Sequence, residues 1–443
     1  MKRIVYILVF LFLGSCTKDK YRLEDLESIK QLAWVKNFGG TGNESPRAII
    51  QTSDGGFAVL GFTNSTDGDL ANKSLNVNDY WLLKLDAEGN IQWQKTYGGS
   101  KDDQGQKVIQ TLDGGYAVTG YAMSNDGDGS NNEGFHDNWV LRLDASGEIV
   151  WEKSFGFSGH DHSYDIIETP DGGLFFSGFL DVTSSNGEGS TSKSSGLTRH
   201  GVGEFWGTKL DPEGNIEWRK FFGGTNNDRS FGVINAYDGG YILSGASESD
   251  DFDISNPKGS YDFWVVKVDK NGNFEWEKSF GGTGIEQARD ITKTADGNYV
   301  LVGNTFSSDT QVTKNNGESD IWLIKISDAG ELIWQHSYGG SNFDSAHAVN
   351  LTANGGFVIS GNSRSSDKDA TVNQGENDFW ILTTDADGTI LTEFSLGGTG
   401  LDLAFDAIET NDGSLILVGE TASSNFPKIA HKGGVDLVVA KVN

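Results

Sequence analysis

A motif of about 58 residues recurs seven times along the 443-residue chain, and this repetition restricts the fold more than any other feature of the sequence. The copies align on one position, occupied in turn by Trp34, Trp93, Trp151, Trp218, Trp276, Trp334 and Thr392. The spacings between these positions are 59, 58, 67, 58, 58 and 58 residues. A period this constant is typical of repeat architectures, in which every copy forms one structural unit.

Each unit contains four strand-like runs, which in the first unit read AWVKNF, RAIIQT, GFAVLGF and DYWLLKL. Turn signals such as DGG (54–56) and DAEGN (86–90) separate them, because Asp and Asn bond the backbone and Gly adopts a positive φ. Glycine is abundant at 60 residues, proline is scarce at 5, and 11% of residues are aromatic, which favours short strands over helices. We therefore predict an all-β fold, a seven-bladed β-propeller of four-stranded antiparallel blades.

The two ends of the repeat array complement each other. We label the strands a (RAIIQT, nearest the axis), b, c and d (QWQKTY, outermost). The array opens with a lone d strand at 32–38 and closes with a c strand, DLVVAKV, at 436–442. Pairing of these strands would complete the seventh blade and leave no blade with an open edge. We expect residues 32–443 to form this single propeller domain, with the strand c tryptophans in its core.

The c-to-d hairpin KLDAEGNIQW resembles the repeat of the quinoprotein-like propellers, in which an Asp, a Gly and a docking Trp recur. The resemblance covers six of seven hairpins and weakens at TTDADGTILT, which lacks the Trp. The whole array also resembles those of secreted and surface-attached bacterial propeller proteins. These resemblances imply the fold rather than an activity. The dehydrogenases of the quinoprotein family carry vicinal cysteines near their cofactor, and this chain has one Cys, so the resemblance does not extend to pyrroloquinoline quinone.

The N-terminal segment MKRIVYILVFLFLGS (1–15) has a basic start and a short apolar run, the pattern of a secretory signal peptide. The adjoining LGSC resembles the cleavage box of bacterial lipoproteins, which implies a diacylated Cys16 followed by a tether at 16–31. An ordinary signal peptide that leaves a free thiol is the alternative. We expect an outer-membrane lipoprotein that faces the periplasm or the exterior.

The net charge of −29 limits the partners of the chain. Nucleic acid is excluded as a natural partner, because phosphate binding requires positive charge. Anionic lipid surfaces are disfavoured as well, so we expect the lipid anchor alone to hold the protein at the membrane.

Strand direction places the d-to-a and b-to-c loops together at one end of the ring, which we call the loop-bearing rim. Two acidic positions recur there in all seven units, and we interpret both as residues that cap turns, because a role shared by every blade is usually architectural. The first set is Glu44, Asp103, Asp161, Asp228, Glu286, Asp344 and Asp402. The second set is Asp79, Asp137, Glu204, Asp262, Asp320, Asp378 and Asp436.

The b-to-c loops add carboxylates in Asp-x-Asp spacing, which suits Ca²⁺, the one cofactor that the sequence suggests and does not require. These candidate ligands are Asp67, Asp69, Asp126, Asp128, Asp250, Asp251, Asp253, Asp367 and Asp369. Turn capping is again the alternative. The segment HDH (160–162) has residue types that bind transition metals, although its middle residue belongs to the first sevenfold set.

The position at the head of strand a is constant in place but variable in type, as expected of a ligand site on a propeller axis, although packing between blades would also explain it. It carries Arg47, Gln106, Tyr164, Phe231, Arg289, His347 and Phe405. The third unit has nine extra residues in its b-to-c loop (181–205), where Arg199 and His200 form a second candidate contact surface or part of a tolerated insertion.

The sequence contains no nucleophile elbow, zinc signature or phosphate loop in a confirming context. We therefore expect a lipid-anchored envelope module that binds protein or glycan through the loop-bearing rim. The alternative is an enzyme acting on extracellular polysaccharide, with rim carboxylates as acid and nucleophile or base.

Overall fold

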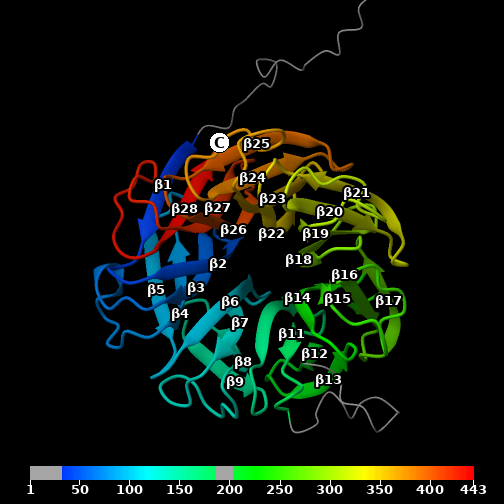
Figure 1. The fold of residues 1–443 in the computed structure, drawn as a ribbon. Helices are drawn as coiled ribbons and strands as arrows, with labels where there is room; N and C mark the ends of the chain where they lie inside the picture. The colour runs from blue at the N-terminus through cyan, green and yellow to red at the C-terminus, as the bar shows by residue number, and fades with distance from the viewer. Residues whose placement is uncertain (1–31, 186–202) are drawn as a thin grey trace, which may run out of the picture.

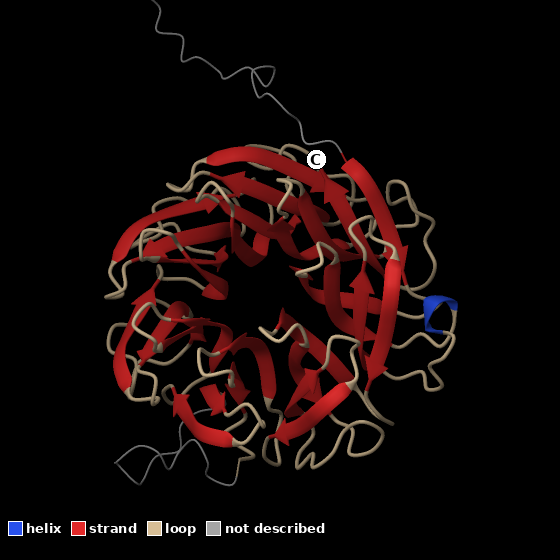
Figure 2. Cartoon of the chain, turned by 180° about the vertical axis from the view of Figure 1, so that it is seen from behind, coloured by secondary structure: helices blue, strands red, loops and turns tan. Residues whose placement is uncertain are grey.

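The computed structural model describes residues 32–185 and 203–443, and it contains seven four-stranded antiparallel sheets arranged as blades around a central axis (Figure 1). Every strand predicted from the repeat is present, and the predicted seven-bladed propeller is confirmed. One short 3-10 helix, η2 (Gly68–Leu70), lies in the first b-to-c loop (Figure 2). In the described residues, no helix is long and apolar enough to span a membrane.

Strands a to d follow one another from the axis outward in each blade. Blades one to three comprise β2 (Glu44–Gln51), β3 (Phe57–Thr63), β4 (Asp79–Leu85), β5 (Ile91–Tyr97); β6 (Asp103–Gln110), β7 (Tyr116–Ala122), β8 (Asp137–Leu143), β9 (Ile149–Phe155); β10 (His162–Glu168), β11 (Leu174–Leu180), β12 (Glu204–Leu210) and β13 (Ile216–Phe222). Blades four to six comprise β14 (Asp228–Asn235), β15 (Tyr241–Ser247), β16 (Asp262–Val268), β17 (Phe274–Phe280); β18 (Glu286–Lys293), β19 (Tyr299–Thr305), β20 (Asp320–Ile326), β21 (Leu332–Tyr338); β22 (Asp344–Leu351), β23 (Phe357–Ser363), β24 (Asp378–Thr384) and β25 (Ile390–Leu396). Blade seven comprises β26 (Asp402–Glu409), β27 (Leu415–Thr421), β28 (Asp436–Val442) and β1 (Leu32–Phe38).

The hydrophobic core lies between adjacent blades rather than at one central point. Strand c is buried on both faces, and its tryptophans Trp81, Trp139, Trp206, Trp264, Trp322 and Trp380 are fully buried. Tyr80 of one blade meets Trp139 of the next edge to face, with ring centroids 4.9 Å apart. Apolar faces on both sides of a strand require a neighbour on both sides, and a closed ring supplies one to every blade.

The ring closes by pairing of β1 with β28. The register places Val35 opposite Ala440 and Phe38 opposite Leu437. Val35 is buried in the cluster between blades six and seven, and Phe38 in the cluster between blades seven and one, so the strand contributes packing as well as backbone hydrogen bonds. The predicted closure is therefore confirmed.

Five outer tryptophans pack against the c-to-d turn of the next blade. The indole of Trp34 lies against Gly89 in the c-to-d turn of blade one, and Trp93 lies against Gly147 in the turn of blade two. A side chain on either glycine would collide with the ring, since an added Cβ at Gly89 would come 2.6 Å from the Trp34 ring. Thr392 would face the c-to-d turn of blade seven, but β28 and β1 are joined there by pairing and not by a hairpin. The missing Trp thus coincides with a missing docking turn.

We predict that deletion of residues 32–38 lowers the free energy of unfolding by more than about 5 kcal/mol, because it exposes several apolar side chains worth about 1.5–3 kcal/mol each. Chemical denaturation of the full and deleted chains measures this loss. Val35→Asp should also be strongly destabilising, whereas Ala33→Asp on the exposed side of the same strand should not. Equal stability of the deleted and full chains would contradict closure by this strand.

Candidate functional site

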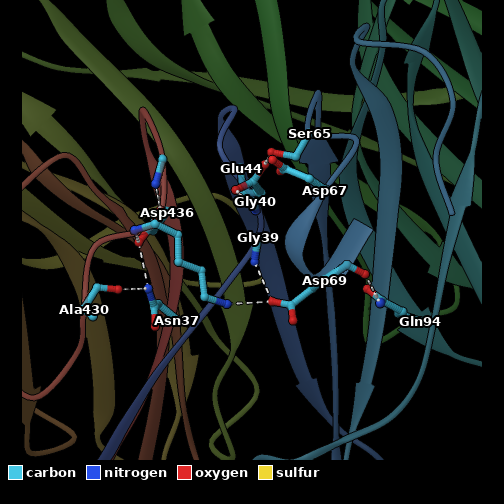
Figure 3. Close-up of polar contacts among 12 residues, drawn as sticks. Asn37, Gly39, Gly40, Glu44, Ser65, Asp67, Asp69, Gln94, Ala430 and Asp436 are labelled. Carbon is cyan, nitrogen blue, oxygen red and sulfur yellow. Dashed lines mark hydrogen bonds and ion pairs between the residues drawn. The ribbon is translucent and has the colours of Figure 1, made fainter. Parts of the chain in front are cut away.

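The loop-bearing rim is held together by hydrogen bonds between its two kinds of loop. At the closing blade, Gly39 in the d-to-a loop donates its N–H to Asp69 in the b-to-c loop (Figure 3), with a nitrogen-to-oxygen distance of 2.9 Å. Lys432 of the last b-to-c loop donates to the same carboxylate at 2.7 Å. These contacts confirm that both kinds of loop share one end of the ring.

The first sevenfold set of acids caps the d-to-a loops. Each carboxylate accepts the backbone N–H of the residue four positions before it, at 2.6–3.0 Å, as Glu44 does from Gly40 (Figure 3). Glu44 also accepts hydrogen bonds from Thr63 and Ser65 and is fully buried. This geometry supports the turn-capping interpretation.

The second sevenfold set lies beside the first across each seam between blades. Asp320 accepts the Asn316 N–H through Oδ2, while its buried Oδ1 has no hydrogen-bond partner and lies close to Asp344 beside Gly339. Oδ1 is likewise without a hydrogen bond in Asp79, Asp137, Asp262 and Asp378. Burial and, to a lesser degree, the negative charge of Asp344 raise the pKa of Asp320 to about 6. The seams therefore hold carboxyl pairs that bind protons more tightly than ordinary Asp residues.

The variable loop acids close the rim from the b-to-c side. Asp67, Asp126, Asp251 and Asp367 each accept a backbone N–H of the d-to-a loop at 2.7–2.8 Å. Asp69, Asp128, Asp253 and Asp369 each accept the N–H of the first glycine of that loop at 2.9–3.3 Å. Asp250 is exposed beside them.

Neutral side chains perform the same task in two other blades. Gln311 accepts the Gly281 N–H at 3.0 Å, and Asn425 accepts the Thr399 N–H at 2.9 Å. These loops therefore need an oxygen acceptor and not a charge. Ca²⁺ binding at the variable acids stays a prediction.

A cavity of about 230 Å³ lies on the axis, and all seven side chains predicted from the head of strand a line it. These residues are Arg47, Gln106, Tyr164, Phe231, Arg289, His347 and Phe405. We call this cavity the axial pocket.

A β-bulge in every strand a produces this convergence. The register of each a-to-b pair shifts at the lining residue, so that Arg47 is the extra residue between Pro46 and Ala48 in β2. The same shift occurs in the other six blades at the corresponding position. A bulge redirects one side chain without ending the strand, which accounts for the lining side chains pointing to one axis.

The side chains of the axial pocket stack on one another. The Arg47 guanidinium lies 4.2 Å from the Phe405 ring centroid, and that of Arg289 lies 4.6 Å from Phe231. Tyr164 and Phe231 pack with ring centroids 5.0 Å apart. Burial, the nearby Arg289 and, to a lesser degree, Arg47 lower the pKa of His347 to about 4, so His347 is neutral at pH 7.

Charged residues one position farther along strand a form a second layer, which the sequence did not reveal as a site. Lys107 lies among three aspartates, with Nζ 3.8 Å from Asp165 Oδ1. Asp165, Asp290 and Asp406 accept the backbone N–H of Val233, Val349 and Ile49 in the following blade, at 2.8–3.1 Å. Burial works against the Lys107 charge, but the three aspartates outweigh it and raise the pKa of Lys107. Burial raises the pKa of Asp165 to about 6, partly offset by Lys107.

A cluster of three histidines lies beside the axial pocket, at the seam between blades two and three. His160 and His162 belong to the HDH segment, and His136 joins them from the loop before β8. Among the described residues, this is the only group of three or more His, Cys, Asp or Glu side chains whose ligand atoms lie within 4.8 Å of one another. Burial and the neighbouring histidines lower the pKa of His162 to about 3. Sequence reasoning missed His136 because 24 residues separate it from His160.

Three candidate residues lie outside the described residues. Arg199 and His200 fall in the segment 186–202, and Cys16 falls in 1–31. Their predicted roles stay predictions.

No family model matches the sequence, and no curated protein matches it. Several solved structures are similar in fold. The WD40 domain of Pan2 from Neurospora crassa is 9% identical, with 90% of this chain and 89% of that chain covered and a TM-score of 0.47. YCF48 in complex with a D1 peptide is 9% identical, with 93% and 96% covered and a TM-score of 0.44. A gluconolactonase from Xanthomonas campestris is 11% identical, with 75% and 92% covered and a TM-score of 0.34. At these identities the likeness concerns the fold and carries no activity to this chain.

We predict that the protein is more stable at pH 5 than at pH 7.5. Burial raises the pKa of Asp79 and Asp161 to about 7 and that of Asp137, Asp262, Asp320 and Asp378 to about 6. In the unfolded chain the pKa of an Asp is about 3.9, so folding takes up protons between pH 4 and 7. The free energy of unfolding therefore falls as the pH rises through this range. Melting temperatures across this range check the sign.

Asp320→Asn tests the origin of this dependence. The amide can donate a hydrogen bond to Asp344 in place of the repelling oxygen, so we expect a gain of about 1 kcal/mol at pH 7.5 and a smaller gain at pH 5. Asp387→Asn, in an exposed turn, is the matched control and should change neither value. A melting temperature that rises steadily from pH 5 to 7.5 would contradict the prediction.

If the variable acids bind Ca²⁺, adding EGTA should lower the melting temperature by several degrees, and returning Ca²⁺ should restore it. Mg²⁺ is the control ion. An unchanged melt in EGTA removes the Ca²⁺ prediction and leaves the loop acids as hydrogen-bond acceptors.

Proposed function

We propose that this chain is a lipid-anchored binding module of the bacterial outer membrane that takes one acidic end of a ligand, a terminal sugar acid of a glycan, into the axial pocket. The observation that carries the proposal is the convergence of seven bulged side chains of different type on one cavity. Anchoring through Cys16 rests on the LGSC segment and the signal-like residues before it. The residue types at the pocket, aromatic faces beside guanidinium groups, indicate the ligand class.

Charge supports an anionic ligand. Among the seven side chains from the heads of the a strands, Arg47 and Arg289 are cationic and none is acidic, in a chain whose net charge is −29. The carboxylates of the pocket, Asp165, Asp290 and Asp406, belong to the next layer, which also holds Lys107. A guanidinium can bind a carboxylate through two parallel hydrogen bonds. Tyr164, Phe231 and Phe405 offer ring faces on which the apolar side of a sugar can stack.

Size supports one unit rather than a chain. The volume of about 230 Å³ falls just below the roughly 300–1,000 Å³ of common ligand pockets. Lys107 and the three aspartates line the pocket one residue farther along strand a, so a ligand that enters from the loop-bearing rim would meet this charged layer. Loops of the rim would then contact the rest of the glycan or the protein that carries it.

Hydrolysis by paired carboxylates, the rival function, has weaker support. Asp165, Asp290 and Asp406 are the carboxylates of the axial pocket, and each is held by a backbone N–H of the next blade. The sevenfold acids of the rim cap turns. A retaining or inverting glycosidase needs one pair free to reach the glycosidic bond.

We predict that the full chain binds oligogalacturonate and does not bind a neutral galactose oligomer of the same length, as measured by isothermal titration calorimetry. Arg289→Ala should weaken binding by about 10- to 100-fold, the equivalent of one charged hydrogen-bonding group. Lys153→Ala, which removes a cation from the outer strand β9, is the matched control.

Equal affinity for the charged and neutral oligomers would contradict an acidic ligand. Unchanged binding in the Arg47→Ala, Arg289→Ala double variant would contradict the axial pocket as the site. Release of reducing ends from the oligomer, lost in Asp165→Asn, would instead support the enzyme.

A further inference from the structure

The histidine cluster is built by the backbone of two blades. An isolated parallel bridge pairs His136, in the loop before β8, with His160, in the loop before β10. His162 follows as the first residue of β10. The Nδ1 atoms of His136 and His160 are 2.9 Å apart, and His162 Nε2 is 3.3 Å from His136 Nδ1. Three imidazole nitrogens from two blades therefore lie within 4.8 Å of one another.

A polar group from outside the cluster lies beside each of two of these rings. His162 Nδ1 lies 3.2 Å from the Tyr164 hydroxyl, and His136 Nε2 lies 3.8 Å from Asp102 Oδ2. Asp102 is held in place by Asn78 and Gln104. When an outer partner takes the N–H of a neutral imidazole, the other ring nitrogen presents a lone pair. His162 Nε2 would then point its lone pair at the space between the rings. His136 Nδ1 would do the same once its Nε2, which makes no hydrogen bond in this structure, moves within hydrogen-bond distance of Asp102. Metal-binding histidines adopt this arrangement.

We propose that His136, His160 and His162 bind one divalent first-row transition-metal ion, with Zn²⁺ the ion that the ligand set suits best. The three metal ligands are not residues of the axial pocket, although Tyr164, which lines that pocket, contacts His162. It adds a metal centre to the loop-bearing rim, with Asp102 as a positioning residue rather than a ligand.

The ring-nitrogen separations fit this ion. Zn–N bonds of about 2.0–2.1 Å in a tetrahedron place two nitrogens about 3.3 Å apart. The His136–His162 pair already has that separation, and the shorter His136–His160 pair must open slightly, which the exposed position of His160 permits. Imidazole ligands favour Zn²⁺, Cu²⁺ and Ni²⁺ over Ca²⁺ and Mg²⁺. Three protein ligands leave a fourth position for water or an anionic group.

A chain of N–H···N hydrogen bonds, with no metal, is the competing explanation. Tyr121 stacks on His162 with centroids 3.9 Å apart, and Phe135 stacks on His160 at 5.1 Å. Packing of this kind would give the histidines a structural role alone. The two explanations differ in what happens when metal is offered, so metal affinity decides between them.

The experiment uses the full chain without a polyhistidine tag, stripped with EDTA and titrated with Zn²⁺ in a calorimeter and with Co²⁺ in a spectrophotometer. We expect one ion per chain and the intense visible absorption of four-coordinate Co²⁺. Loss of an outer partner costs about 10- to 100-fold in metal affinity. His160→Ala removes a ligand, so it should weaken Zn²⁺ binding by more than that. Because His160 is exposed, the melting temperature of the His160→Ala variant in EDTA should equal that of the parent chain.

Two further variants sharpen the result. Asp102→Asn should weaken Zn²⁺ binding by about 10- to 100-fold while one ion per chain still binds, as expected of a positioning residue. His336→Ala, on outer strand β21, is the matched control and should bind Zn²⁺ like the parent. The proposal would be overturned if the parent chain and His160→Ala bound Zn²⁺ with the same affinity. It would also be overturned if His336→Ala lost as much Zn²⁺ affinity as His160→Ala. Neither outcome depends on a glycan, so the proposed function is tested separately.

Discussion

The pairing of β1 with β28 is the constraint on which the rest of the structure depends, because it turns a row of repeats into a ring with one axis. Without that pairing, blade seven would expose the edge of β28 and the apolar side chains that Val35 and Phe38 cover. With it, all seven a strands face one another across a common centre. The axial pocket is therefore a property of the closed ring and not of any single blade.

The odd number of blades shapes the layer below the pocket. Asp165, Asp290 and Asp406 each reach from one blade over a small residue, Gly232, Ala348 or Ala48, to the backbone of the next. These bonds join blades three to four, five to six and seven to one. One blade is left without a partner, and it places Lys107 among the three carboxylates. Pairing blades in twos around a ring of seven thus leaves one position for a compensating cation.

The sequence alone predicts the architecture well, because the repeat carries its own evidence. The constant period predicts the number of blades and the closure of the ring. The strands follow from side chains that alternate between apolar and polar or stay apolar, and their order places both kinds of loop at one rim. The seven pocket-lining residues follow as well, since Arg47 and its counterparts differ in type at one fixed position. The bulge that redirects them does not follow, because an extra residue in a strand leaves no signal in a single sequence. The weakening of the hairpin pattern at Thr392 is explained only by the ring, in which blade seven offers no c-to-d turn for a Trp to cover.

The histidine cluster shows why residues that break the repeat are more informative about function than those that keep it. At every seam, the residue before strand c bridges or approaches the residue before the next strand a. The corresponding pairs elsewhere include Gly203 with Asn227, Ser319 with Phe343 and Asn377 with Leu401. The backbone geometry is thus the same at each seam, while the side chains are free to differ. Two histidines at one such seam, with a third beside them, cannot be required by the fold, because the other seams form without them. A repeated backbone provides seven equivalent places, so a site particular to this protein is to be sought where the side chains differ.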